Sequence, residues 1–70
     1  MKFSQFIKAQ RAGAKLTQAD LAAKAGVGLR FIRDMEQGKE SLRLDKVNQV
    51  LKLFGYETGA VPINQDDEQL

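Results

Sequence analysis

The chain has 70 residues, of which 43% are hydrophobic and 29% charged, a balance typical of one small globular domain. It contains no cysteine and no histidine, which excludes disulfides, thiol nucleophiles, imidazole bases and most zinc or iron sites. We therefore expect a binding protein rather than an enzyme, without metal or cofactor. No apolar run is long enough for a membrane span and the first residues do not resemble a signal peptide, so we expect a cytoplasmic protein.

The net charge of +2 conceals a strong asymmetry along the chain. Up to residue 33, seven Lys or Arg residues stand against a single acidic residue, whereas residues 64–70 contain three acidic residues and no basic one. A basic surface attracts nucleic acid, because neutralising phosphates releases their counterions. A solvated charged face would have the same composition, so charge alone does not decide the function.

The spacing of apolar residues predicts helices over residues 4–12 and 18–25. Gly13 is expected to take the left-handed conformation that closes the first helix. Thr17 and Asp20 have the spacing of a capping box at the start of the second, in which hydroxyl and carboxylate satisfy free backbone amides. Both segments are therefore expected to be helices with defined ends.

Two further helices are predicted over residues 29–37 and 44–54, closed by Gly38 and Gly55. Residues 56–63 include Gly59 and Pro62 and are expected to form a short edge strand or an extended arm, and residues 64–70 a flexible acidic tail. The expected organisation is a helical domain over residues 1–55, followed by a possible dimerisation strand and the tail. The apolar face of the last helix comprises Leu44, Val47, Val50, Leu51 and Phe54.

Residues 18–37 have the pattern of two short helices that cross at a steep angle. Ala22 is small enough for a close crossing, and Gly26 allows the positive backbone angle that the turn requires. Such a pair is a helix-turn-helix, whose second helix enters the DNA major groove. The residues expected in the shared core are Leu21, Ala25, Val27, Ile32 and Met35, and those expected to face outward are Leu29, Arg30, Arg33, Asp34 and Gln37.

The segment LTQADLAAKAGVGLRFIRDMEQGK, residues 16–39, resembles the Xre/Cro-type helix-turn-helix family that includes the lambda-type phage repressors. The resemblance implies an all-α, compact, lambda-repressor-like domain of four to five helices that binds double-stranded DNA, with an internal ion pair between Arg11 and Glu36. Residues 30–57 resemble the HipB-like antitoxins, which implies a homodimer that binds a palindromic operator, represses its own operon and holds a HipA-like kinase toxin. A phage-type repressor, a restriction-modification controller and a protein-interaction module without DNA binding remain alternatives.

Four outward residues of the third helix are candidates for contacts with bases. Arg30 and Arg33 can each bind guanine O6 and N7 through the planar guanidinium, or a phosphate alone. Leu29 can meet a thymine methyl group or pack over the turn. Asp34 can accept a hydrogen bond from cytosine N4 or orient Arg30, four residues earlier.

Five residues are candidates for contacts with the DNA backbone. Thr17 and Gln18 lie at the start of the second helix, where free amides and the helix dipole favour phosphate, and the family resemblance places such a contact at Gln18. Gly28 lies at the start of the third helix and offers a backbone amide but no hydroxyl. Lys39 and Arg43 follow that helix and either flank the phosphates or are solvated loop residues.

Overall fold

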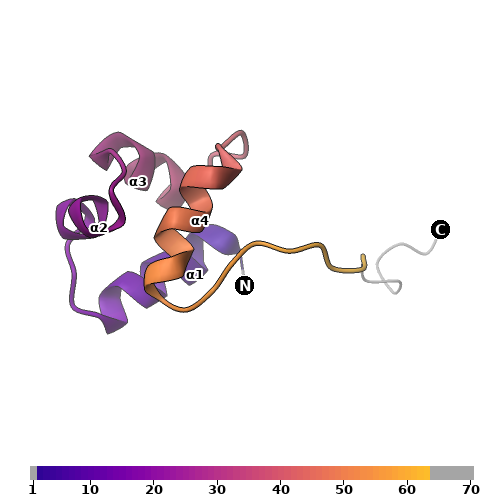
Figure 1. The fold of residues 1–70 in the computed structure, drawn as a ribbon, viewed down its shortest axis with the longest axis horizontal. Helices are drawn as coiled ribbons and strands as arrows, with labels where there is room; N and C mark the ends of the chain where they lie inside the picture. Colours follow the sequence, from indigo (N-terminus) through magenta and orange to yellow (C-terminus); the bar gives the residue numbers. More distant parts are fainter. Residues whose placement is uncertain (1, 64–70) are drawn as a thin grey trace.

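The computed structural model describes residues 2–63, and four α-helices form the body of this part (Figure 1). In chain order they are α1 (Phe3–Gly13), α2 (Gln18–Ala25), α3 (Leu29–Glu36) and α4 (Leu44–Leu53). No fifth helix and no strand occurs within residues 2–63, so the predicted four to five helices are four there. None of these helices is long and apolar enough to cross a membrane.

The sequence predicts both ends of α2 correctly. Thr17 Oγ1 accepts from the Asp20 N–H and Asp20 Oδ2 from the Thr17 N–H, each at 3.0 Å, so the capping box is complete. The backbone hydrogen bond from Thr17 is the main reason why the pKa of Asp20 is lowered. At the other end Gly26 has φ +74°, which only glycine adopts without strain.

The predicted closure of α1 at a left-handed Gly13 is wrong. The helix continues through Gly13, and the positive φ of +60° falls on Lys15. The Lys15 N–H donates to Ala12 O at 3.0 Å and the Leu16 N–H to Arg11 O at 3.1 Å, which is the hydrogen-bond pattern of a Schellman motif. Helix α1 therefore extends one residue further at its C-terminal end than predicted, and a lysine carries the strained conformation.

All four helices contribute to one core. The residues buried there are Ile7, Leu21, Ala22, Ile32, Met35, Val47, Val50 and Leu51, with Phe6, Ala25, Val27, Phe31 and Phe54 packed against them. Leu44, the first residue of α4, was predicted on its buried face, but it is 60% exposed. Phe3, at the start of α1, is also exposed.

Beyond α4 the chain is held at two points and then leaves the helical body. The ring of Tyr56 meets Phe6 edge to face, with ring centres 4.9 Å apart, and Asn48 Oδ1 accepts from the N–H and hydroxyl of Thr58 at 2.9 and 3.0 Å. Residues 59–63 extend away from the helices and include no strand (Figure 1). The predicted acidic tail, residues 64–70, lies outside the described residues.

Candidate nucleic-acid interface

Helices α2 and α3 are joined by a turn whose geometry is held from both sides. The N–H groups of Gly26 and Val27 donate to Ala22 O at 3.0 and 3.1 Å, which closes α2. From α4, the Gln49 side-chain amide donates to Ala25 O at 3.1 Å and to Gly26 O at 3.4 Å. The angle between the two helices is thus stabilised by a third helix, a contact that the linear pattern did not predict.

An ionic cluster around the buried Glu36 ties α1 to the start of α2 and the end of α3. Arg11 Nε and Nη2 donate to Glu36 Oε2 and Oε1 at 2.7 and 3.0 Å, and Arg11 Nη1 donates to Leu16 O at 3.0 Å. The Gln18 side-chain amide donates to Glu36 Oε1 at 3.0 Å. Although Glu36 is only 2% exposed, three side-chain donors satisfy its carboxylate. The cluster therefore fixes where α3 ends relative to α1.

The charge state of this cluster follows from opposing effects. Burial by itself raises the pKa of Glu36, but the hydrogen bonds from Arg11 and Gln18 outweigh it and hold that pKa below its usual value. The hydrogen bond to Glu36 likewise raises the pKa of Arg11. Both groups are thus charged at neutral pH. Gln18, expected to contact phosphate, has its side-chain amide engaged inside this cluster in the free protein.

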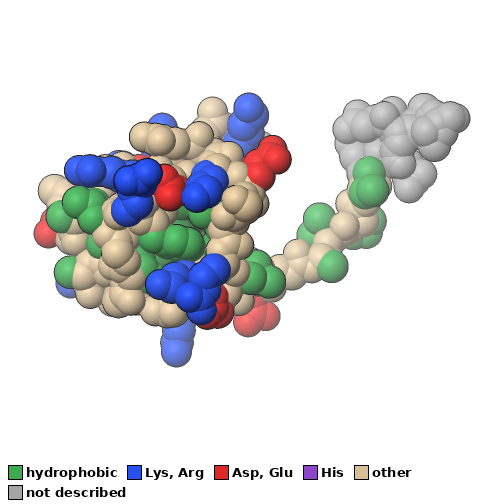
Figure 2. Space-filling model, turned by 90° about the horizontal axis from the view of Figure 1, so that it is seen from above, with side chains coloured by type: hydrophobic (Ala, Val, Ile, Leu, Met, Phe, Trp, Pro, Cys, Tyr) green, Lys and Arg blue, Asp and Glu red, His purple; other side chains and the backbone are tan. Residues whose placement is uncertain are grey.

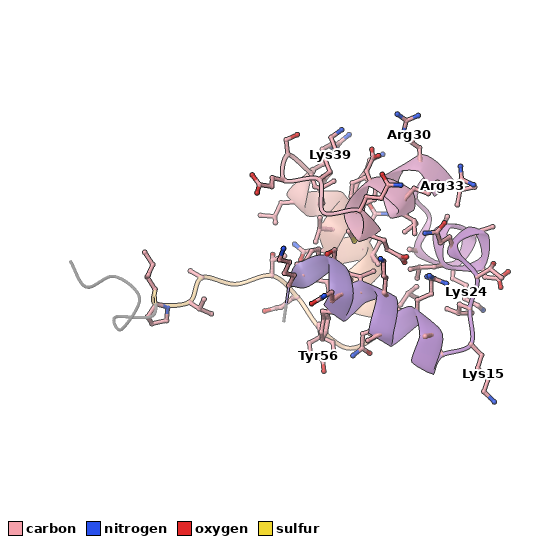
Figure 3. The ribbon with its side chains drawn as sticks, turned by 180° about the vertical axis from the view of Figure 1, so that it is seen from behind. Lys15, Lys24, Arg30, Arg33, Lys39 and Tyr56 are labelled. Atoms are coloured by element: carbon pink, nitrogen blue, oxygen red, sulfur yellow. The ribbon has the colours of Figure 1, made fainter. Side chains whose placement is uncertain are left out.

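The outer face of α3 presents the predicted arginines. Arg30, whose side chain is 87% exposed, and Arg33 point away from the helical body, and Lys39 projects on the same side as Arg30 (Figure 3). Seen from above the view of Figure 1, Lys and Arg side chains are distributed over the helical part of the surface (Figure 2). Exposed cations that point outward from one face attract polyanions.

Asp34 lies within the same face and links two of its cations. Its Oδ1 lies 3.5 Å from Arg30 Nε, and its Oδ2 lies 3.6 Å from Lys39 Nζ. The first contact is the one expected from the i, i+4 spacing, and the second joins α3 to the loop that follows it. Sequence reasoning missed this second contact, because Lys39 returns past Asp34 only after the chain turns at Gly38, whose φ is +86°.

Three other predicted contact residues differ in their exposure and hydrogen bonding. Leu29 was expected to face outward, yet it is partly buried and packs against the core. Gly28 is the N-cap of α3 without a side-chain cap, in open space where an added Cβ meets nothing within 4 Å. Thr17 Oγ1 accepts from the Asp20 N–H, which leaves its own hydroxyl hydrogen for a further acceptor.

Arg43 is engaged with an acidic neighbour. Its Nη2 and Nε lie 2.7 and 3.2 Å from the two carboxylate oxygens of Asp45, and this hydrogen bonding is the main cause of the lowered pKa of Asp45. Both side chains are largely exposed, so the pair is weak in energetic terms. A phosphate contact at Arg43 would compete with Asp45, whereas Arg33 has no carboxylate within salt-bridge distance among the described residues.

Comparison with known proteins agrees with this geometry. A model of the family described as "Helix-turn-helix" matches residues 7–61. The chain belongs to the helix-turn-helix family. Its helix-turn-helix unit is α2, the turn at Gly26 and α3, and the match also includes α4 with its Gln49 contact to the turn.

Two relatives carry names that refer to the same motif. One is an uncharacterized HTH-type transcriptional regulator of Sinorhizobium fredii, 47% identical over 49 residues, which are 70% of this chain and 64% of the relative. The other is an uncharacterized HTH-type transcriptional regulator of Methanocaldococcus jannaschii, 39% identical over 62 residues, which are 89% of this chain and 94% of the relative. The matched region thus spans under two thirds of the first relative's length and nearly all of the second's.

Proposed function

We propose that this helix-turn-helix protein binds double-stranded DNA in a sequence-specific manner and represses transcription, without catalysing a reaction. The observation that carries the proposal is the exposure of Arg30 and Arg33 on α3, a helix whose orientation is held by Gln49 and by the Glu36 cluster. In this arrangement α3 enters the major groove and the start of α2 approaches the phosphate backbone. The names of both relatives support the regulatory role.

The first test is a titration of the protein against a fluorescent duplex from its own promoter and a scrambled duplex, at about 150 mM salt, where weak surface contacts are screened. We expect tight binding to the promoter duplex alone. Equal weak binding to both duplexes, or none to either, would contradict sequence-specific recognition and favour the protein-interaction module.

Variants of the charged residues locate the surface that binds. Arg33→Ala should weaken promoter binding by about 1–3 kcal/mol and relax preference at one base position. Lys15→Gln is the charge-matched control, because Lys15 lies on the opposite side of the helical body from Arg30 and Arg33 in Figure 3. If the two variants lose affinity equally, the recognition face is not the outer face of α3.

We also propose that the protein binds a palindromic operator as a homodimer. Two copies related by a two-fold axis present two α3 helices to successive turns of the same groove, with half-site centres about 34 Å apart. Duplexes that carry one or two half-sites distinguish this from binding by single chains. A stoichiometry of one chain per two-half-site duplex would contradict the homodimer.

The finer proposal is that this repressor is the antitoxin partner of a HipA-like kinase, for which the resemblance of residues 30–57 to HipB-like antitoxins is the support. Co-expression with the product of the adjacent gene, followed by size-exclusion chromatography and a phosphotransfer assay, tests it. A stable complex with a kinase is expected. A neighbouring gene product without kinase activity would favour a phage-type repressor or a restriction-modification controller.

A further inference from the structure

The segment after Thr58, residues 59–63, combines apolar composition with almost complete exposure. Val61 is 81% and Ile63 72% exposed, and in Figure 2 this segment stands clear of the helical body with its hydrophobic side chains uncovered. We call residues 59–63 the arm. Its root is held in place, since Thr58 is bonded to Asn48 and Tyr56 packs on Phe6. The arm therefore leaves the protein from a defined point and in a defined direction.

A groove of about 750 Å³ opens beside the root of the arm. It lies between the start of α1, the loop from α3 to α4, and the first turns of α4. Its charged lining residues are Lys2, Lys39 and Glu40, so positive charge exceeds negative charge by one. Its apolar lining consists of Phe3, Met35, Leu42, Leu44 and Val47, and Thr58 lines it as well.

The arm runs away from the helices, so residues 59–63 do not fill this groove (Figure 1). Five residues of extended chain beyond Thr58 span up to about 17 Å, enough to reach a neighbouring molecule. The groove contains two exposed apolar side chains, those of Phe3 and Leu44. The arm also carries two exposed apolar side chains, those of Val61 and Ile63. The sequence after the arm is acidic, with Asp66, Asp67 and Glu68, opposite in sign to Lys2 and Lys39.

We infer that the arm of one copy docks into the groove of a second copy, and that the reciprocal exchange of two arms forms the dimer. The inference rests on the homodimer part of the proposed function and deepens it, and it can be tested without DNA. Because each chain contributes one arm and one groove, the exchange closes after two copies with two-fold symmetry. The uncovered apolar surface of both elements is buried in one step.

Sedimentation equilibrium on the full chain tests the inference. In an arm variant, Val61→Lys with Ile63→Lys, and in a groove variant, Leu44→Glu, dimer dissociation constants should rise at least about tenfold. Both variants should keep the circular dichroism spectrum and unfolding midpoint of the monomer, since these side chains are exposed. Leu53→Glu is the matched control, an exposed leucine of α4 outside the groove that should leave dimerisation unchanged.

Mixing the arm and groove variants distinguishes exchange from direct pairing of two arms. In a mixed dimer, the intact arm of the groove variant meets the intact groove of the arm variant, so one of the two docking sites is wild type. We therefore expect the mixture to dimerise more tightly than either variant alone. Pairing of two arms would give no such rescue, because every mixed pair would contain one altered arm.

The outcomes distinguish the exchange of arms from the formation of a homodimer by any other contact. A wild-type dimer that persists in the arm or groove variant, or a mixture without rescue, would overturn the exchange and leave the homodimer intact. A wild-type chain that stays monomeric at millimolar concentration would overturn both, whereas the duplex titration would still report on DNA binding. Weakened variants with rescue on mixing would establish the exchange.

Discussion

Asp34 places a carboxylate inside the face that we propose to meet DNA. It lies 3.5 Å from Arg30 Nε and 3.6 Å from Lys39 Nζ, so a phosphate that approaches either cation competes with it. The same contact limits the conformations of Arg30, a long side chain whose ordering otherwise costs entropy. We expect Asp34 to lower affinity for arbitrary DNA more than affinity for the operator.

The variant Asp34→Asn tests this role. Affinity for a scrambled duplex should rise severalfold, and the dependence of log affinity on log salt should steepen by about one unit per subunit, because Lys39 becomes free to neutralise a phosphate. Binding is measured by fluorescence anisotropy between low and physiological salt. Glu57→Gln, which neutralises an exposed carboxylate outside this face, should leave the slope unchanged. An unaltered slope in Asp34→Asn would contradict the competition.

Glu36 makes a different kind of contribution, to stability rather than recognition. Its pKa is lower in the folded protein than in the unfolded chain, so the unfolded chain binds more protons in acid. The stabilisation is complete above the unfolded-state pKa of about 4.3 and is lost as the pH falls through the lower folded value.

The variant Glu36→Gln should therefore lose about 2 kcal/mol in free energy of unfolding at pH 7, because Arg11 keeps its charge without a carboxylate partner. The difference from wild type should shrink as the pH falls below about 4. Urea unfolding at several pH values measures both effects. A constant difference across that range would show that the ionised carboxylate is not what stabilises the fold. Asp20 and Asp45, with their own lowered pKa values, remain in the variant and preserve part of the pH dependence.

At the scale of the helices, two glycines differ in what their positions require. Gly13 is helical with open space around it, whereas Gly26 has φ +74° beneath Gln49. Gly13→Ala should raise the free energy of unfolding by about 0.5–1 kcal/mol, and Gly26→Ala should lower it by about 1–2 kcal/mol. Denaturant unfolding measures both changes in the free energy of unfolding, and the midpoints can be compared directly where the variants and the wild type have the same denaturant dependence. Destabilisation by Gly13→Ala would mean that α1 does not continue through that residue.

The sequence predicts where the helices lie better than which faces they bury. Each predicted boundary lies within one residue of the observed one, because caps and glycines act over a few neighbouring residues. Leu44 and Leu29 were assigned from periodicity, which gives the angle of a residue around its helix but not which turns of the helix are covered by neighbours. Leu44 is therefore exposed although it shares the apolar face of α4, and Leu29 is partly buried.

The partners of polar residues near the interface were harder to predict than the helices, because one polar side chain can form hydrogen bonds or ion pairs with several different groups. Arg11 and Glu36 could be paired only through resemblance to a family, since 25 positions separate them and no local rule connects them. Gln18 has a position suited to phosphate, yet its amide donates to Glu36 in the folded chain. Composition shows that the first half of the chain is basic, but only the folded backbone shows that Lys39 returns to Asp34.

At the scale of the whole molecule, the hydrogen bonds between Thr58 and Asn48 attach the root of the arm to α4. Asn48→Ala removes the acceptor for both hydrogen bonds of Thr58. We expect faster hydrogen exchange at the Thr58 amide, with little change in global stability because the contact is peripheral. Gln49→Ala is the neighbouring control and should leave that amide protected. Unchanged exchange in Asn48→Ala would mean that other contacts hold the root.

Asn48 and Gln49 are consecutive residues of one helix, yet they hold opposite parts of the molecule: Asn48 bonds the root of the arm, and Gln49 bonds the turn before α3. A shift or rotation of α4 therefore displaces both attachments together. A ligand at the arm that favoured one position of this helix would change affinity at α3, and thermodynamic linkage would then require a ligand at α3 to change affinity at the arm by the same factor. We therefore expect the proposed subunit association at the arm and the proposed DNA binding at α3 to be thermodynamically coupled through this turn of α4.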